Sequence, residues 1–195
     1  VFPMNCRIPP EEIAAEFSMP TSGNALMIPG AGWGTKQWPA ANFAKAGRML
    51  EEKGLHVVVA GSPAEEELCG QVASGLENPT VFIQPLSKLV SLLELCDIVI
   101  SNDSGVAHIA AARNILTAAI FCPTNPAFCG PVGDNARVFR SPCPLRPEGD
   151  AHHCPYSTSP SCPRAEWMAI SPESVAEACL AAREAPTEKT VAPRI

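Results

Sequence analysis

The feature that most constrains the fold is a regular alternation of short apolar runs with segments of helical periodicity. Five runs rich in β-branched or small apolar residues are expected to be strands: 25–28, 56–60, 80–83, 97–101 and 117–121. Unbroken apolar strands that alternate with helices are typical of a parallel sheet covered on both faces. The sequence therefore predicts an α/β domain built on a parallel sheet.

The expected helices rest on apolar residues that recur every three or four positions. Four lie between the strands, marked by Phe43-Ala46-Gly47-Leu50, Leu68-Val72-Leu76, Leu89-Leu92-Leu93-Cys96 and Val106-Ile109-Ala110-Arg113. A short helix is expected near 11–17. A last helix is expected over 172–185, with Ser171 as its N-cap and Pro172 at the first helical position.

The chain divides into a lead-in over 1–23, one domain over 24–185 and a tail over 186–195. Seven of the 21 prolines fall between 142 and 172. Proline lacks a backbone donor and fixes φ, so an irregular segment is expected over 142–170. The first residue is not methionine, and we expect the chain to be a piece of a longer or processed protein.

Composition excludes several classes of function. The net charge of −6 argues against binding to nucleic acid or to an anionic membrane surface. No apolar run approaches the roughly 20 residues of a membrane-spanning helix. The nine cysteines are an odd number, and the start of the chain does not resemble a secretory signal. A reduced, cytoplasmic setting is therefore expected.

Polar and glycine residues gather in the loops that follow the strands. Ligands of open parallel sheets bind at the carboxyl edge, where these loops lie. The first loop offers Gly30, Gly32 and Lys36, a set that suits backbone approach to a phosphate with a nearby point charge. Its glycine spacing matches neither the dinucleotide fingerprint nor the P-loop. The alternative is a flexible turn with an exposed lysine.

The fourth loop, over 101–108, joins a strand to a helix. Asp103 or Ser104 is a candidate N-cap, Gly105 permits close approach and His108 lies one turn inside the helix. A helix amino terminus attracts anions such as phosphate. The alternative is an ordinary capped helix start with a structural histidine.

Three further positions at this edge have weaker patterns. Glu65 follows the second strand, where an acid can hold ribose hydroxyls, although it also suits the first turn of a helix. Leu86 follows the third strand and offers an apolar surface to a base. Thr124 follows the fifth strand and offers a hydroxyl.

The late cysteines allow a different interpretation. Cys143, Cys154 and Cys162, with His153, are a candidate structural zinc site. The chain contains no Cys-x-x-Cys pair, which weakens this alternative. It nevertheless leaves open a zinc-stabilised interaction domain.

Taken together, the loops resemble the lipopolysaccharide heptosyltransferases of glycosyltransferase family 9. The matching pieces are Lys36-Gln37-Trp38-Pro39, Gly61-Ser62-Pro63-Ala64-Glu65, Ser101-Asn102-Asp103-Ser104-Gly105-Val106-Ala107-His108, Pro123-Thr124-Asn125-Pro126 and the segment 167–175. The resemblance covers about residues 24–180. It implies a Rossmann-like domain, specifically the C-terminal, donor-binding half of a two-domain GT-B enzyme.

The resemblance also implies roles for single residues. Lys36 would contact the diphosphate and Asp103 the heptose hydroxyls, and these two are the catalytic candidates. The donor, expected to be ADP-heptose, would further contact Gly30, Gly32, Glu65, Leu86, Ser104, Gly105, His108 and Thr124. No Asp-x-Asp motif surrounds Asp103, so a metal-independent inverting transfer without a cofactor is expected.

The resemblance places the acceptor, the lipopolysaccharide inner core, on an N-terminal domain that this chain lacks. That domain would also supply the catalytic base. The expected location is cytoplasmic, at the inner membrane face. The alternative is a non-catalytic module that binds a nucleotide sugar without transferring it.

Overall fold

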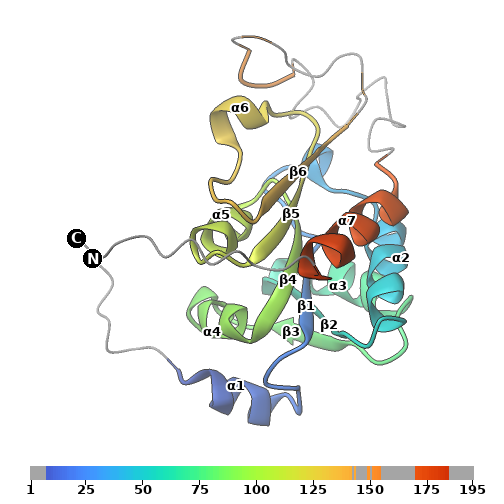
Figure 1. Ribbon diagram of the computed structural model, residues 1–195, viewed down its shortest axis with the longest axis vertical. Helices are drawn as coiled ribbons and strands as arrows, with labels where there is room; N and C mark the ends of the chain where they lie inside the picture. Colours follow the sequence, from blue (N-terminus) through green and yellow to red (C-terminus); the bar gives the residue numbers. More distant parts are fainter. Residues whose placement is uncertain (1–7, 142, 144–148, 150, 155–169, 185–195) are drawn as a thin grey trace, which may run out of the picture.

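The fold is an all-parallel, six-stranded sheet in the order β3-β2-β1-β4-β5-β6 (Figure 1). We describe it from a computed structural model, over residues 8–141, 143, 149, 151–154 and 170–184. The strands are β1 (Asn24–Ile28), β2 (His56–Gly61), β3 (Thr80–Ile83), β4 (Cys96–Asn102), β5 (Leu116–Phe121) and β6 (Ala136–Arg140). The predicted parallel α/β architecture is confirmed.

Helices lie between successive strands, and one further helix precedes the first strand and another follows the last. They are α1 (Pro10–Glu16), α2 (Ala40–Glu51), α3 (Glu66–Ala73), α4 (Leu86–Leu92), α5 (Gly105–Ala112), α6 (Pro126–Cys129) and α7 (Pro172–Glu184). Short 3-10 turns occur at η2 (Gly34–Lys36), η3 (Pro63–Glu65) and η4 (Leu93–Leu95). Within the described part of the chain, no helix combines the length and apolarity needed to cross a membrane.

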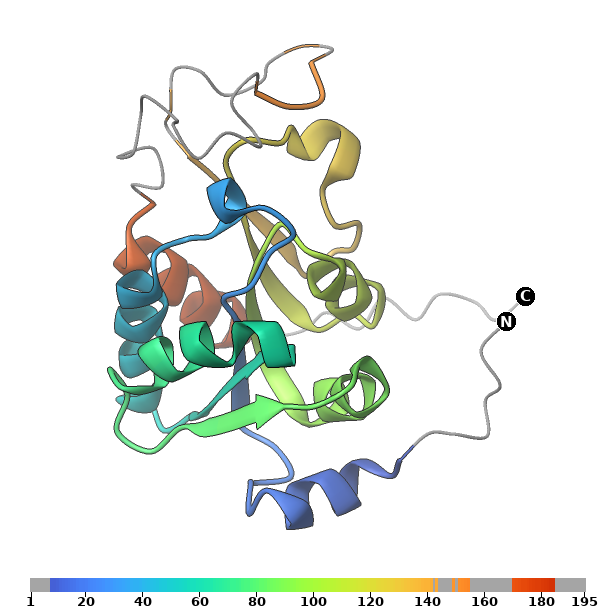
Figure 2. The ribbon, with the colours of Figure 1, turned by 180° about the vertical axis from the view of Figure 1, so that it is seen from behind.

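The strand residues alternate between two cores. Met27, Val59 and Ile100 belong to a buried cluster with residues of α2, α3 and α7, whereas their neighbours Ile28 and Val58 belong to a second cluster with α1 and α4. Figures 1 and 2 show helices on both sides of the sheet. Both faces are buried, which explains why the strands are continuously apolar rather than alternating.

The structure corrects several details of the prediction. The sixth strand, β6, was not predicted, because two of its five residues are arginine and its exposed positions conceal the apolar pattern. Cys96 begins β4 instead of ending a helix, and α3 ends at Ala73, before Leu76. The predicted cap of α7 is confirmed, since the Ser174 amide donates to Ser171 Oγ at 3.4 Å.

An ion pair joins α7 to α2 on the outer surface. The Lys45 ammonium contacts the Glu173 carboxylate. Hydrogen bonds from Lys45 and from the Ser171 hydroxyl lower the pKa of Glu173 to about 2. Glu173 therefore stays ionised down to strongly acidic pH.

Candidate functional site

The candidate site lies where the strand order reverses. β1 and β4 are neighbours in the sheet, and the connections that leave them run to opposite sides. In doubly wound sheets, ligands bind at the carboxyl ends of the strands beside such a reversal. The loops that begin at Pro29 and Asp103 meet at this point.

Three of the predicted residues form one cluster here. Lys36 Nζ lies 2.6 Å from Asp103 Oδ2, and the Thr124 hydroxyl donates to the same oxygen at 2.6 Å. The exposed fractions of Lys36 and Asp103 are 16% and 7%. A carboxylate with two short contacts in a mostly buried setting is held in a fixed orientation.

The lysine is presented by a short turn after β1. The Lys36 amide donates to Trp33 O at 2.9 Å, and residues 34–36 form the turn η2. The Lys36 ammonium also lies 4.6 Å from the centre of the Trp33 ring, a cation–π geometry. The first loop is therefore an ordered support for Lys36, and not the flexible turn of the alternative interpretation.

Asn102 is a site residue that the sequence reasoning missed. It is fully buried at the last position of β4. Its side chain accepts a hydrogen bond from the Trp38 amide at 2.9 Å and donates to Pro29 O at 2.7 Å. The available signal was an amide residue at the end of an otherwise apolar strand, directly before Asp103.

The sequence predicts that the side chain of Asp103 or Ser104 caps α5, and the structure shows a different arrangement. Ser104 occupies the N-cap position but makes no capping bond, and its hydroxyl pairs with Ser101 Oγ at 2.9 Å. The Asp103 carboxylate is taken by Lys36 and Thr124. These side chains therefore leave the first-turn amides of α5, which point out of its amino end, available to an anion.

Glu65 and Gly30 connect the loops after β2 and β1. Glu65 Oε2 accepts from the amide and the hydroxyl of Ser62, each at 2.8 Å. The Glu65 carboxyl group fills the space that a side chain at position 30 would need. Glycine at position 30 therefore permits the close approach, and the capping arrangement predicted for the fourth loop occurs in the second.

The remaining predicted residues lie outside these contacts. Leu86 is 55% exposed at the start of α4, and His108 is exposed on α5. Gly32 and Gly105 have open space around the position of a Cβ atom. Within the described ranges, no hydrogen bond or ion pair joins the Leu86 or His108 side chain to Asp103.

A segment beyond β6 returns to the same edge. The Asn125 amide donates to His152 O at 2.8 Å, and the Cys154 amide donates to Pro123 O at 2.6 Å. This antiparallel pairing brings His153 opposite Thr124 and beside Trp33, with ring centres 6.4 Å apart. Residues 151–154 thus extend the site beyond the sheet loops.

The residues of the zinc alternative lie only partly within the described structure. Cys143 and Cys154 are buried, and Cys162 lies outside the described residues. Over the residues that are described, no group of three or more histidine, cysteine or acidic residues could hold a metal ion.

A further cysteine, Cys129, lies close to the cluster and was not predicted. Burial and the charge of Asp103 raise the pKa of its thiol, against the opposing effects of Lys36 and a hydrogen bond with Thr124. Its Sγ also contacts Asn125 O at 3.2 Å. The thiol is therefore mostly protonated near neutral pH, and its pKa depends on the charge of Asp103.

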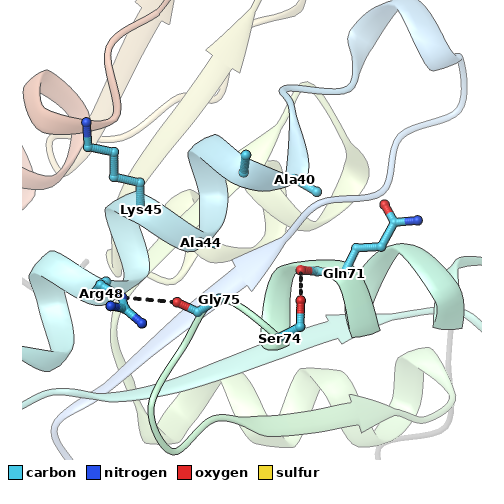
Figure 3. Close-up of a pocket in the computed structure, with 8 residues that line it drawn as sticks. Ala40, Ala44, Lys45, Arg48, Gln71, Ser74 and Gly75 are labelled. Atoms are coloured by element: carbon cyan, nitrogen blue, oxygen red, sulfur yellow. Dashed lines mark hydrogen bonds between the residues drawn. The ribbon is translucent and has the colours of Figure 1, made fainter.

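A surface pocket of about 520 Å³ lies elsewhere, between α2 and α3 (Figure 3). Arg48 and Gly75 form one wall, joined by a 3.2 Å hydrogen bond from Arg48 Nε to the Gly75 carbonyl. On the α3 side, the Ser74 hydroxyl donates to Gln71 O at 2.8 Å. None of the predicted site residues lines this pocket, so we place the candidate site at the sheet edge.

Known proteins resemble the chain over most of its described part. The family model for glycosyltransferase family 9 (heptosyltransferase) matches residues 8–154. Lipopolysaccharide heptosyltransferase 1 of Pseudomonas aeruginosa is 33% identical over 127 residues, which cover 63% of this chain and 35% of the relative. Lipopolysaccharide heptosyltransferase 2 of Escherichia coli is 32% identical over 120 residues, 57% of this chain and 34% of the relative. The chain thus spans about a third of the length of these curated relatives.

Solved structures agree with these matches. The E. coli ADP-heptose lps heptosyltransferase II superposes with a TM-score of 0.71 at 26% identity, covering 90% of this chain and 52% of that one. The E. coli heptosyltransferase WaaC with ADP gives a TM-score of 0.59 at 25% identity, covering 73% and 46%. With three quarters of its length matched by the family model, the chain belongs to glycosyltransferase family 9, the heptosyltransferase family.

Proposed function

We propose that the chain is the C-terminal, donor-binding half of a heptosyltransferase. In this proposal it binds ADP-heptose, or a closely related nucleotide sugar, for inverting transfer to the lipopolysaccharide inner core. The observation that carries the proposal is the cluster of Lys36, Asp103 and Thr124 beside the amino end of α5. Support comes from one relative, the E. coli heptosyltransferase WaaC, whose structures are described with ADP and with ADP-2-deoxy-2-fluoro heptose.

The cluster suits the charge changes of glycosyl transfer. As the sugar–phosphate bond breaks, negative charge grows on the departing diphosphate and positive charge on the sugar. The Lys36 ammonium and the first-turn amides of α5 would stabilise the diphosphate. The Asp103 carboxylate, oriented by Thr124, would accept hydrogen bonds from the sugar hydroxyls. Fixed charge in these positions allows transfer without a metal ion.

Recognition of the nucleoside is assigned to the neighbouring loops. Both hydrogen bonds of the Glu65 carboxylate use Oε2, so within the described residues Oε1 remains available to a ribose hydroxyl. Leu86 would offer its exposed side chain to adenine. Gly30, Gly32, Ser104, Gly105 and His108 complete the proposed donor contacts.

Binding of ADP tests the donor site directly. We expect calorimetry to detect ADP and ADP-heptose with the unmodified chain, and Lys36→Met to weaken both by about tenfold or more, because it removes a charge-assisted contact. Lys45→Met is the matched control, since Lys45 is 60% exposed and pairs with Glu173 on α2 and α7. Equal affinities for Lys36→Met and the unmodified chain would exclude Lys36 from the site.

Transfer requires the acceptor half, which the proposal places on an N-terminal domain with the catalytic base. The proposed acceptor is a membrane lipid, which fits a cytoplasmic enzyme working at the inner membrane face. Joining this chain to the N-terminal half of a family 9 relative should give transfer that Lys36→Met abolishes. Donor binding without transfer in this hybrid would favour a non-catalytic nucleotide-sugar module.

A further inference from the structure

The Asn102 side chain forms hydrogen bonds with both ends of the first loop, at Pro29 and at Trp38. Its amide nitrogen donates to Pro29 O at 2.7 Å and reaches Gly30 O at 3.4 Å, where the loop leaves β1. Its amide oxygen accepts from the Trp38 amide at 2.9 Å, where the loop enters α2. One fully buried side chain therefore holds the two ends of the segment that carries Lys36.

The same residue sets the other half of the cluster. Asn102 is the last residue of β4, and Asp103 follows it directly. The Asp103 amide donates to Ile120 O at 3.0 Å, which fixes the chain immediately after Asn102. Asn102 therefore bonds to both ends of the loop that carries Lys36 and directly precedes Asp103 in the chain.

The indole ring of Trp38 makes further contacts with the core. Its indole Nε1 donates to Ile170 O at 3.0 Å, and its ring packs against Phe43 at 5.0 Å. Trp38 is fully buried, so the loop end that Asn102 holds cannot shift without disturbing the core. The buried Trp38 side chain fixes the α2 end of the first loop. The hydrogen bond between the Trp38 amide and Asn102 joins this fixed end to β4.

We propose that Asn102 is a positioning residue that holds the Lys36 loop in register with Asp103 for recognition of the donor diphosphate. Asparagine suits this role because one side of its amide donates and the other accepts. Aspartate would lose the donor that the two carbonyl groups require. This inference rests on the proposed donor site and adds a residue that does not itself touch the donor.

Asn24 provides a matched control in the same sheet. It is also fully buried, but it lies at the amino end of β1. Its amide donates to Pro20 O at 2.9 Å and to Leu95 O at 2.8 Å. Asn24→Ala and Asn102→Ala therefore each remove a buried amide that donates to backbone carbonyl groups, at opposite ends of the strands, and only Asn102→Ala also removes an acceptor. Both variants should unfold at lower temperature than the unmodified chain.

The decisive measurement is ADP affinity in a double-mutant cycle with Lys36→Met. We expect Asn102→Ala to weaken ADP binding by about tenfold, and to add less than about threefold in the Lys36→Met background. Asn24→Ala should leave ADP affinity unchanged. Unchanged ADP affinity in Asn102→Ala, or full additivity with Lys36→Met, would overturn the proposal.

A second measurement does not depend on ADP. Limited acetylation with acetic anhydride, read by mass spectrometry, reports how freely each lysine amine reacts. We expect Lys36 to react several times faster in Asn102→Ala than in the unmodified chain or in Asn24→Ala, with Lys45 unchanged. An unchanged Lys36 rate would refute the positioning role.

The two measurements separate the possible failures. If the unmodified chain binds no ADP, the proposed function fails, and the acetylation rate still decides the role of Asn102. If Asn102→Ala does not fold, Asn102→Ser is measured in both assays, since its hydroxyl can keep one of the three contacts. The same outcomes apply to that variant.

Discussion

Replacing Asp103 with asparagine should strengthen the binding of ADP and reduce the preference of the site for ADP-heptose over ADP. In the free protein, Lys36 Nζ lies 2.6 Å from Asp103 Oδ2, so ADP must draw the ammonium away from a partner it already has. Asparagine removes this competing charge but keeps an oxygen that can accept from the Thr124 hydroxyl. The variant therefore separates the charge of Asp103 from its shape.

The size of the effect follows from the burial of the pair. Two unit charges about 4 Å apart attract by about 4 kcal/mol at an effective dielectric constant of about 20, before the cost of desolvation. Exposed pairs contribute only about 0–1 kcal/mol. With exposed fractions of 16% and 7%, this pair lies between these limits. We expect loss of the competing carboxylate to favour ADP by about 1–2 kcal/mol, or about 5- to 30-fold.

ADP-heptose should respond differently, because the proposed sugar contacts are lost with the carboxylate. A hydrogen bond to a charged group contributes about 1.5–3 kcal/mol, so the advantage of ADP-heptose over ADP should shrink by at least about tenfold. Calorimetry with both ligands at one salt concentration measures the two affinities, and thermal unfolding without ligand checks that the variant is folded. Equal weakening of both ligands would refute the competition between Asp103 and the diphosphate.

Further predictions concern other parts of the structure. Gly30→Ala should displace the Glu65 carboxyl group and weaken ADP binding. Gly32→Ala should leave the ADP affinity unchanged, because the space around position 32 is open. Calorimetry measures the ADP affinity of both variants. The folded pKa of Glu173, about 2, lies below the usual value of 4.5, so its stabilising effect is complete above pH 4.5 and is lost as the pH falls toward 2. Acid unfolding of Glu173→Gln, compared with the unmodified chain, should show a difference that vanishes at the acidic end. Because the Asp103 charge raises the Cys129 pKa, Asp103→Asn should speed alkylation of Cys129 by iodoacetamide near neutral pH, and an unchanged rate would contradict this.

Much of the fold was predictable because both faces of the sheet are buried. Each of the five predicted strands contains an apolar run, and every residue of β1 and β5 is buried. The sixth strand lies at the edge of the sheet, where Arg137 and Val138 are exposed and no apolar run forms. The other edge strand, β3, was recognisable because three of its four residues are apolar, whereas two of the five residues of β6 are arginine.

The sequence predicted which loops meet at the carboxyl edge of the sheet, but not the contacts among their side chains. Carboxyl-edge loops were expected to carry Lys36, Asp103 and Thr124, and the structure brings them together. The role of Asn102 could not be predicted, because its hydrogen bonds cross to residues more than sixty positions earlier in the chain. Helix-capping rules failed at Asp103 because a tertiary ion pair competes for the same carboxylate.

The central position of β1 has a consequence for how the domain forms. β1 is the first strand of the sheet to be synthesised, yet it pairs with β2 and β4, and Met27 meets Ile100 more than seventy residues later. Closing such loops before any stabilising contact forms makes folding slow. During translation, one side of β1 stays without its partner until β4 leaves the ribosome. Lys36 and Asp103 lie on the loops after β1 and β4, so a nascent chain can bring the two proposed donor-binding groups together only when the middle of the sheet closes.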